Sequence, residues 1–212
     1  MPLSKNLSSL ILVLLVSAVF SADPDKYLAA YNRAYESLKS VEADFKVETN
    51  IMLTGENSVQ KGKFIFMKPD MFRVDLKKLK IVSDGVNYWQ YSVKNNQVVI
   101  NDVADVSSSL LPTEILYDYS RKYNASNMGT VSISGEKTHK LRLQRKDGQK
   151  SSVRTTVYLS VNSNLPVKIE SLDSDGNLTS YYFRNYALNK EYAPGLFIFK
   201  IPSECEIIDM RE

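Results

Sequence analysis

The stretch KGKFIFMKPDMFRVDLKKLKIVSDGVNYWQY, residues 61–91, decides the fold that the sequence predicts. Pro69-Asp70 and Asp84-Gly85 are turn signals, and they divide the stretch into three strand segments. Within the segments, apolar and polar residues alternate with the period of two that is typical of a half-buried sheet. The large apolar side chains are Phe64, Phe66, Phe72, Val74, Trp89 and Tyr91. The stretch therefore predicts an antiparallel sheet with one strongly aromatic face.

These side chains, together with Phe45 on an earlier segment, are the candidate binding residues. Large aromatic residues on a curved sheet leave gaps that a few thin helices fill incompletely, and an apolar concavity of this kind is a common ligand site. We therefore expect the concave face to bind lipid through Phe45, Phe64, Phe66, Phe72, Val74, Trp89 and Tyr91. The alternative is an ordinary hydrophobic core, which is the commoner role for any one of these residues.

An amphipathic helix precedes the sheet. Asp23 and Pro24 are a typical helix start, and apolar residues then recur at helical spacing up to Leu38. From Ala43 to Thr49 the period changes to two, which predicts the first strand. Turn signals divide the second half into further short strands, and they lie at Gly135, Asp147-Gly148, Asn162 to Pro166 and Asp175-Gly176. The sequence predicts a single α+β domain with roughly ten strands in a sandwich or barrel, covered by the helix on its concave side.

A second apolar segment interrupts the polar connection that follows residue 103. Its apolar residues recur at helical spacing around a proline: Leu110, Leu111, Ile115, Leu116 and Tyr119. We predict a short amphipathic helix here, called the lid, which adds Leu111, Ile115 and Leu116 to the lipid-binding residues. A packed connector without a role in binding is an equally good interpretation.

Residues 1–21 have the pattern of a cleaved signal peptide. A basic residue precedes an apolar run, Leu10 to Phe20, that is too short to span a bilayer, and small residues follow it. Cleavage after Ser21 is favoured over cleavage after Ala22, which would leave a bulky residue at a recognition position. No cysteine follows the run to carry a lipid anchor. We expect residues 22–212 to be one exported, soluble domain.

Composition and motifs argue against several other classes of protein. A net charge of +3 is too small and too dispersed for a nucleic-acid binder. The densest basic cluster, Lys77 to Lys80, is interpreted as a solvated hairpin end rather than a site for anionic headgroups. His139 is the only histidine, predicted in a polar turn, and Cys205 is the only cysteine, predicted to be buried. We expect no catalytic residue, metal site, cofactor or disulfide.

The order of a glycine, an aromatic strand, the basic-Pro turn, Phe72 and Ser83-Asp84-Gly85 resembles the LolA family of periplasmic carriers of outer-membrane lipoproteins. A weaker resemblance extends from the first helix to the ending Phe197–Pro202. It implies an unclosed antiparallel β-barrel, or half-barrel, with helices over its hydrophobic concave face. It further implies a periplasmic carrier, expected to be a monomer, that takes acylated lipoproteins from an inner-membrane ATP-binding-cassette release complex (LolCDE-like) to an outer-membrane acceptor (LolB-like).

The resemblance also implies roles for single residues. Lys68 stands where the family often has an arginine that holds the lid shut through backbone carbonyls. Lysine lacks the planar fork of arginine, so the latch would be looser or differently made. Phe72 matches an aromatic residue that receives and releases the lipoprotein. Val74 is smaller than the tryptophan of well-known members, which would enlarge the cavity locally.

A second function, from another class, stays open at this point. Related half-barrels act as lipid- or lipoprotein-sensing regulatory modules that signal to a protein partner. The absence of a visible second signalling domain in the sequence argues mildly against this role.

Overall fold

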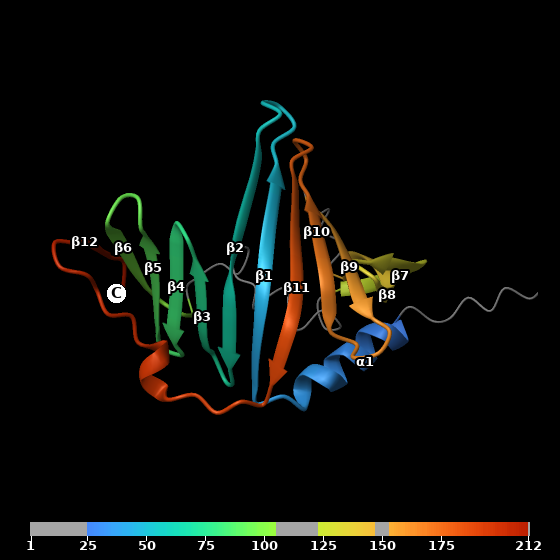
Figure 1. The fold of residues 1–212 in the computed structure, drawn as a ribbon, viewed down its shortest axis with the longest axis horizontal. Helices are drawn as coiled ribbons and strands as arrows, with labels where there is room; N and C mark the ends of the chain where they lie inside the picture. Colours follow the sequence, from blue (N-terminus) through green and yellow to red (C-terminus); the bar gives the residue numbers. More distant parts are fainter. Residues whose placement is uncertain (1–24, 105–122, 147–152, 212) are drawn as a thin grey trace, which may run out of the picture.

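The computed structural model describes residues 25–104, 123–146 and 153–211. These residues form one α-helix, a short 3-10 helix and a single twelve-stranded sheet (Figure 1). Within the described ranges, neither helix has the length and hydropathy that a membrane span requires. The predicted signal peptide, the predicted lid and the predicted helix start at Asp23-Pro24 all lie outside the described residues.

The elements follow one another with short connections over most of the chain. In order they are α1 (Asp25–Glu36), β1 (Ser40–Asn50), β2 (Asn57–Met67), β3 (Met71–Leu76), β4 (Leu79–Asp84), β5 (Asn87–Ser92), β6 (Gln97–Asp102), β7 (Tyr123–Ile133), β8 (Glu136–Arg145), β9 (Arg154–Ser160), β10 (Pro166–Leu172), β11 (Leu178–Leu188), η2 (Pro194–Phe197) and β12 (Glu206–Asp209).

The sheet is open. Its strand order is β12-β6-β5-β4-β3-β2-β1-β11-β10-β9-β8-β7, and the two end strands do not pair with each other. Every pairing is antiparallel except the parallel pairing of β12 with β6. The prediction of an unclosed, mainly antiparallel sheet is therefore confirmed. The prediction of roughly ten strands is too low, because β7 is polar along most of its length and β12 is short and pairs with a distant segment.

Two predicted turns are confirmed, and in both an aspartate carboxylate holds the backbone. Asp84 Oδ1 accepts the N–H groups of Val86 and Asn87, at 2.9 and 2.7 Å, and so closes the connection between β4 and β5. Asp173 Oδ1 accepts the N–H groups of Asp175 and Asn177, both at 2.9 Å, between β10 and β11. Aspartate favours such turns because its short side chain reaches backbone donors two to four residues ahead.

One face of the sheet, called the inner face, carries the main hydrophobic core. This core joins Tyr88 on β5 to Leu141 on β8, strands that are far apart in the sheet order. The sheet curls toward this face, because Ile133 at the end of β7 lines one cavity with Phe45 of β1, although four strands separate them in the sheet order. Phe45 belongs to the main core, so the inner face is the concave face. Helix α1 packs on it through Leu28, Tyr31 and Tyr35, which are spaced three and four residues apart.

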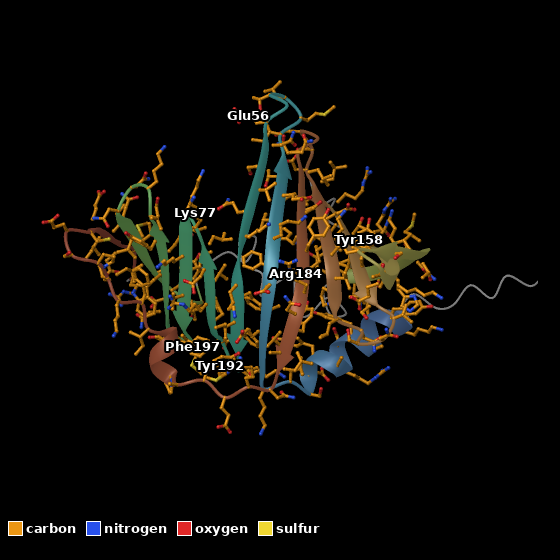
Figure 2. The ribbon with its side chains drawn as sticks, in the orientation of Figure 1. Glu56, Lys77, Tyr158, Arg184, Tyr192 and Phe197 are labelled. Carbon is orange, nitrogen blue, oxygen red and sulfur yellow. The ribbon has the colours of Figure 1, made fainter. Side chains whose placement is uncertain are left out.

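The opposite, outer face has a smaller core under the C-terminal segment. After β11 the chain passes through η2 and then adds β12 to the far edge of the sheet, beside β6 (Figure 1). Phe197 in η2 is fully buried, and its ring lies edge-on to Tyr192 at a centroid distance of 6.4 Å (Figure 2). The C-terminal segment thus acts as a cover over the outer face of β3 to β6.

Candidate lipid-binding cavity

Five of the predicted lipid-binding residues come together on the inner face. Cross-strand pairing aligns them, because Phe66 lies opposite Phe72 and Phe64 lies opposite Val74. None of the five is more than 3% exposed, and all belong to the main core with α1. The inner-face residues of the prediction are Phe45, Phe64, Phe66, Phe72 and Val74.

A cavity opens where the inner face curls toward its own edge. It has a volume of about 450 Å³ and lies between Phe45 and Phe183, on the central strands, and Ile133 at the β7–β8 turn. Val167 on β10 completes the apolar part of its wall. The rest of the wall is polar or charged and consists of Lys46, Lys61, Ser134, Glu136, Tyr182 and Arg184. A volume of this size lies within the range that small-molecule sites occupy. Phe45 is the one predicted residue that lines it.

The prediction that Trp89 and Tyr91 share the concave face is wrong. Phe72 lies opposite Ser83, and Ser83 lies opposite Tyr88, so Tyr88 shares the inner face with Phe72. Trp89 and Tyr91 point to the outer face, since successive side chains of a strand alternate between faces. Each is 9% exposed, in a separate core with Val82, Val98 and Ile100.

The C-terminal segment closes this outer core. The ring of Phe199 lies 5.4 Å from that of Tyr91, and Cys205 packs against the same cluster. The Tyr91 hydroxyl donates to Asn96 Oδ1 at 2.9 Å, so its one polar group is satisfied. Cys205 is half-buried rather than buried, and its thiol lies 3.4 Å from the Glu206 carbonyl oxygen. The aromatic residues of the outer face are thus part of a closed core.

Lys68, the predicted lid latch, contacts α1 in the structure. Its ammonium donates to the carbonyl oxygens of Tyr35 at 3.2 Å and Glu36 at 2.7 Å, and it lies 5.2 Å from the centre of the Tyr35 ring. These carbonyls are at the C-terminal end of α1, where unpaired acceptors and the helix dipole favour a cation. The lid itself lies outside the described residues, so the predicted contact between Lys68 and the lid stays a prediction.

His139 does not lie in a turn, as the sequence predicts, but within β8. Its ring packs against Tyr27 of α1 at a centroid distance of 4.0 Å. Burial lowers the pKa of His139, and the nearby charges of Lys26 and Lys137 lower it further. The ring is therefore a neutral packing group between α1 and the sheet. In the described part of the chain, no group of three or more His, Cys, Asp or Glu side chains could hold a metal ion.

Sequence reasoning missed most of the cavity wall. Phe183 and Val167 fall in segments that the sequence predicts as strands, and the period-two alternation of these segments was the available signal for their faces. Ile133 follows a polar run that gives no strand signal, so its place at the rim follows only from the fold. Tyr88, overlooked in favour of Trp89, is buried on the inner face, and burial raises its pKa to about 12.

Known proteins share both the sequence pattern and the fold. An uncharacterized protein of Methanocaldococcus jannaschii is 26% identical over 87% of this chain, and the chain spans only 53% of that protein's length. The outer-membrane lipoprotein carrier protein of Actinobacillus pleuropneumoniae serotype 3 is 27% identical over 99% of the chain and 95% of its own length. The crystal structure of an uncharacterized conserved protein from Thermus thermophilus superposes with a TM-score of 0.58 at 14% identity, covering 87% of this chain and 97% of that one.

The sequence model of one family covers most of the chain. This family is described as outer membrane lipoprotein carrier protein LolA, and its model matches residues 36–200. The match begins at the end of α1 and includes both the inner-face aromatic residues and the cavity wall. The chain therefore belongs to the LolA family.

Proposed function

We propose that this protein is a periplasmic carrier that binds the acyl chains of lipoproteins against its inner face and passes them from the inner to the outer membrane. The observation that carries the proposal is the cavity of about 450 Å³ beside Phe45 and Phe183, in a sheet whose edges do not close. The name of the Actinobacillus relative supports it. The predicted signal peptide supports the periplasmic location.

The proposal has a physical basis in the cost of exposing lipid to water. An acyl chain of about 16 carbons costs on the order of 12 kcal/mol to expose, at about 0.8 kcal/mol per methylene. A carrier must offset most of this cost and still release the chain. An open sheet with an apolar inner face would meet both needs, because the cavity shields part of the chain while the unclosed edges leave it a way out.

The carrier would act by binding alone. The LolA-type donor and acceptor, an inner-membrane release complex and an outer-membrane receptor, belong to the proposal, as does the monomeric state. In a host without an outer membrane, a lipoprotein bound in this cavity would need another destination. The proposed reaction cycle contains no covalent step, so His139 is assigned no chemical role in it.

The first test is intact mass spectrometry of the protein purified gently from its native periplasm. Near-stoichiometric acylated protein bound to the chain is the expected result, and it would identify the cargo. Bound free lipid without acylated protein would instead favour a lipid-sensing module or a general lipid shuttle. An empty protein that also fails to take up added lipoprotein would assign the inner-face residues to an ordinary core.

A pair of variants tests whether the ligand binds in the cavity. Ile133→Trp adds bulk at the half-buried rim and should abolish uptake of a purified triacylated lipoprotein by filling the space beside Phe45. Val86→Trp adds the same bulk at an exposed turn residue, 65% exposed, and should leave uptake unchanged. Equal uptake by both folded variants would contradict binding at this cavity.

A further inference from the structure

Two hairpins project beyond the rest of the sheet at one end (Figure 1). β1 and β2 pair from Ser40–Met67 up to Asn50–Asn57, whereas β3 pairs with β2 only between Gly62 and Met67. The end of the β1–β2 hairpin therefore extends past β3. The turn between β10 and β11 reaches the same end of the sheet. We call residues 51–57 and 173–177 together the double tip.

The top of the double tip is apolar and exposed. Leu53 is 92% exposed and Met52 is 71% exposed, the two largest values among the exposed large hydrophobic residues of the described chain. Single exposed apolar residues are ordinary on protein surfaces. Two adjacent ones at the apex of a projecting hairpin are different, because both would lose their contact with water together if the apex entered a pocket.

Hydrogen bonds hold the double tip in one conformation. The Ile51 N–H donates to the Glu56 carbonyl oxygen at 2.9 Å, and the Gly55 N–H donates to the Ile51 carbonyl oxygen at 2.8 Å. The two hairpins are also joined, because the Met52 N–H donates to Asn177 Oδ1 at 3.0 Å. A Cβ atom on Gly176 would lie only 3.2 Å from Met52 Cγ, so the turns are in contact. An apex ordered in advance loses little conformational entropy when it binds.

The charge of the double tip is negative, in contrast to the net charge of +3 of the chain. It contains Glu56, Asp173 and Asp175 and no lysine or arginine. Glu56 stands at the top of the molecule (Figure 2). Hydrogen bonds from the Asn177 side chain and backbone lower the pKa of Asp173, so its carboxylate is charged at neutral pH. Such a surface is repelled by anionic phospholipid and attracted by basic groups.

We propose that the double tip docks into a protein partner whose apolar pocket receives Leu53 and Met52 and is bordered by lysine or arginine side chains. A buried apolar anchor surrounded by complementary charge is the usual organisation of a tight contact between proteins. The charges steer the encounter and Leu53 prolongs the bound state. The inference goes beyond the carrier function and does not depend on which ligand occupies the cavity.

The test begins with a photo-crosslinking amino acid at position 53 of the full chain, expressed in its own host. The same group at position 86, which is also exposed and lies at the β4–β5 turn, is the matched control. We expect one dominant protein to be captured from position 53 and not from position 86. That protein is then purified, and its affinity is measured for the unmodified chain and for the variants Leu53→Asp, Glu56→Lys and Val86→Asp.

The expected result is a loss of affinity of about tenfold or more for Leu53→Asp. Glu56→Lys should slow association and reduce its dependence on salt, while Val86→Asp should bind within about twofold of the unmodified chain. Matching circular dichroism and thermal melting, together with unchanged lipoprotein uptake, would show that Leu53→Asp is folded and that the cavity is intact.

Three results would overturn the proposal. One is the absence of a position-specific crosslink at residue 53. The second is a captured partner whose affinity Leu53→Asp does not change. The third is flotation of the unmodified chain, but not of Leu53→Asp, with vesicles of phosphatidylethanolamine and phosphatidylglycerol, which would make a lipid surface the occupant instead.

Discussion

The inner and outer faces of the sheet both bury aromatic residues, but they are covered in different ways. The outer face lies under the chain's own C-terminal segment, which is fixed by the β12–β6 ladder, by the contact of Phe199 with Tyr91, and by a bond from Arg73 to the Leu196 carbonyl oxygen at 3.2 Å. The inner face is covered by α1, whose C-terminal end is held by Lys68.

The difference separates structural aromatic residues from candidate binding residues. This cover can leave only if the β12–β6 pairing and the contacts of η2 and Phe199 are broken, so Trp89 and Tyr91 stabilise the fold. On the inner face a cavity of about 450 Å³ remains between the central strands and the β7–β8 turn. Residue type alone does not distinguish these roles, because phenylalanine, tyrosine and tryptophan are equally suited to a core and to an acyl-binding wall.

The largest expected effect comes from removing the outer-face tryptophan. Trp89→Ala should lower the free energy of unfolding by about 3 kcal/mol, because it leaves a cavity in a closed core. Uptake of lipoprotein per folded molecule should not change. Urea denaturation and an uptake assay measure the two quantities. Phe45→Ala is the matched inner-face variant, expected to lose comparable stability and also to alter uptake. If folded Trp89→Ala lost uptake, the assignment of the outer-face aromatic residues to a purely structural role would be wrong.

A smaller loss of stability is expected at Glu42, which holds the start of the C-terminal segment that covers the outer face. Glu42 accepts hydrogen bonds from Lys63 at 2.7 Å, from Tyr192 at 2.5 Å and from Lys190 at 3.0 Å. These bonds, led by that of Lys63, lower the pKa of Glu42 from 4.5 to about 2. Since the two lysines are about half exposed and screened by solvent, Glu42→Gln should cost about 1.5 kcal/mol at pH 7.

The pH dependence of this effect has a definite sign. A carboxyl group whose pKa is lower in the folded state stabilises the protein fully above its unfolded pKa and loses that contribution as the pH falls toward the folded value. The difference in stability between the unmodified chain and Glu42→Gln should therefore be full above pH 4.5 and shrink toward pH 2. Denaturation curves at several pH values measure it. A difference that stayed constant with pH would show that the carboxylate charge is not what anchors the outer cover.

Helix α1, which covers the inner face, offers a third test at its C-terminal end. Lys68→Met removes both bonds to the α1 carbonyls and should lower stability by about 1 kcal/mol. It should also speed hydrogen exchange in the last turn of α1 more than in β12. Lys68→Arg keeps a cation and donors in place and should restore most of the protection. Equal protection in all three proteins would mean that burial of Leu28 and Tyr31 alone holds the helix.

The smallest effect is expected at the edge of the outer core. Cys205 is half-buried and makes one weak contact through its sulfur, so Cys205→Ala should change stability by about 0.5 kcal/mol or less. Thermal melting measures this. A larger loss would show that the outer cover depends on this side chain more than its exposure indicates.

Local signals in the sequence predict much of the fold. The turns at Asp84 and Asp173, the first helix and the strands of residues 61–91 are all found in the structure. They are predictable because the side chain that fixes each turn lies within a few residues of the backbone it holds. The inner-face role of Phe64, Phe66 and Phe72 follows for the same reason, since they lie on neighbouring strands joined by a short turn.

Features that depend on register or on distant pairing are not predictable in this way. The face of Trp89 depends on how many residues each turn contains, and a shift of one residue moves a side chain to the opposite face. The cavity wall combines Phe45 with Ile133, which come together only because the sheet curls. Likewise, β12 becomes a strand only through β6, which lies far away in the sequence.

The pairing of β1 with β11 has a consequence for how the chain folds. Two parts of the sheet, β1 to β6 and β7 to β11, are each a run of hairpins between sequence neighbours, but the joint between these parts brings Val41 of β1 opposite Leu188 of β11. Contacts so distant in sequence form slowly, because a large loop must close before they can form. The centre of the sheet therefore forms only once nearly the whole chain is present. A chain truncated before β11 would leave β1 with an open edge, where other chains could pair with it.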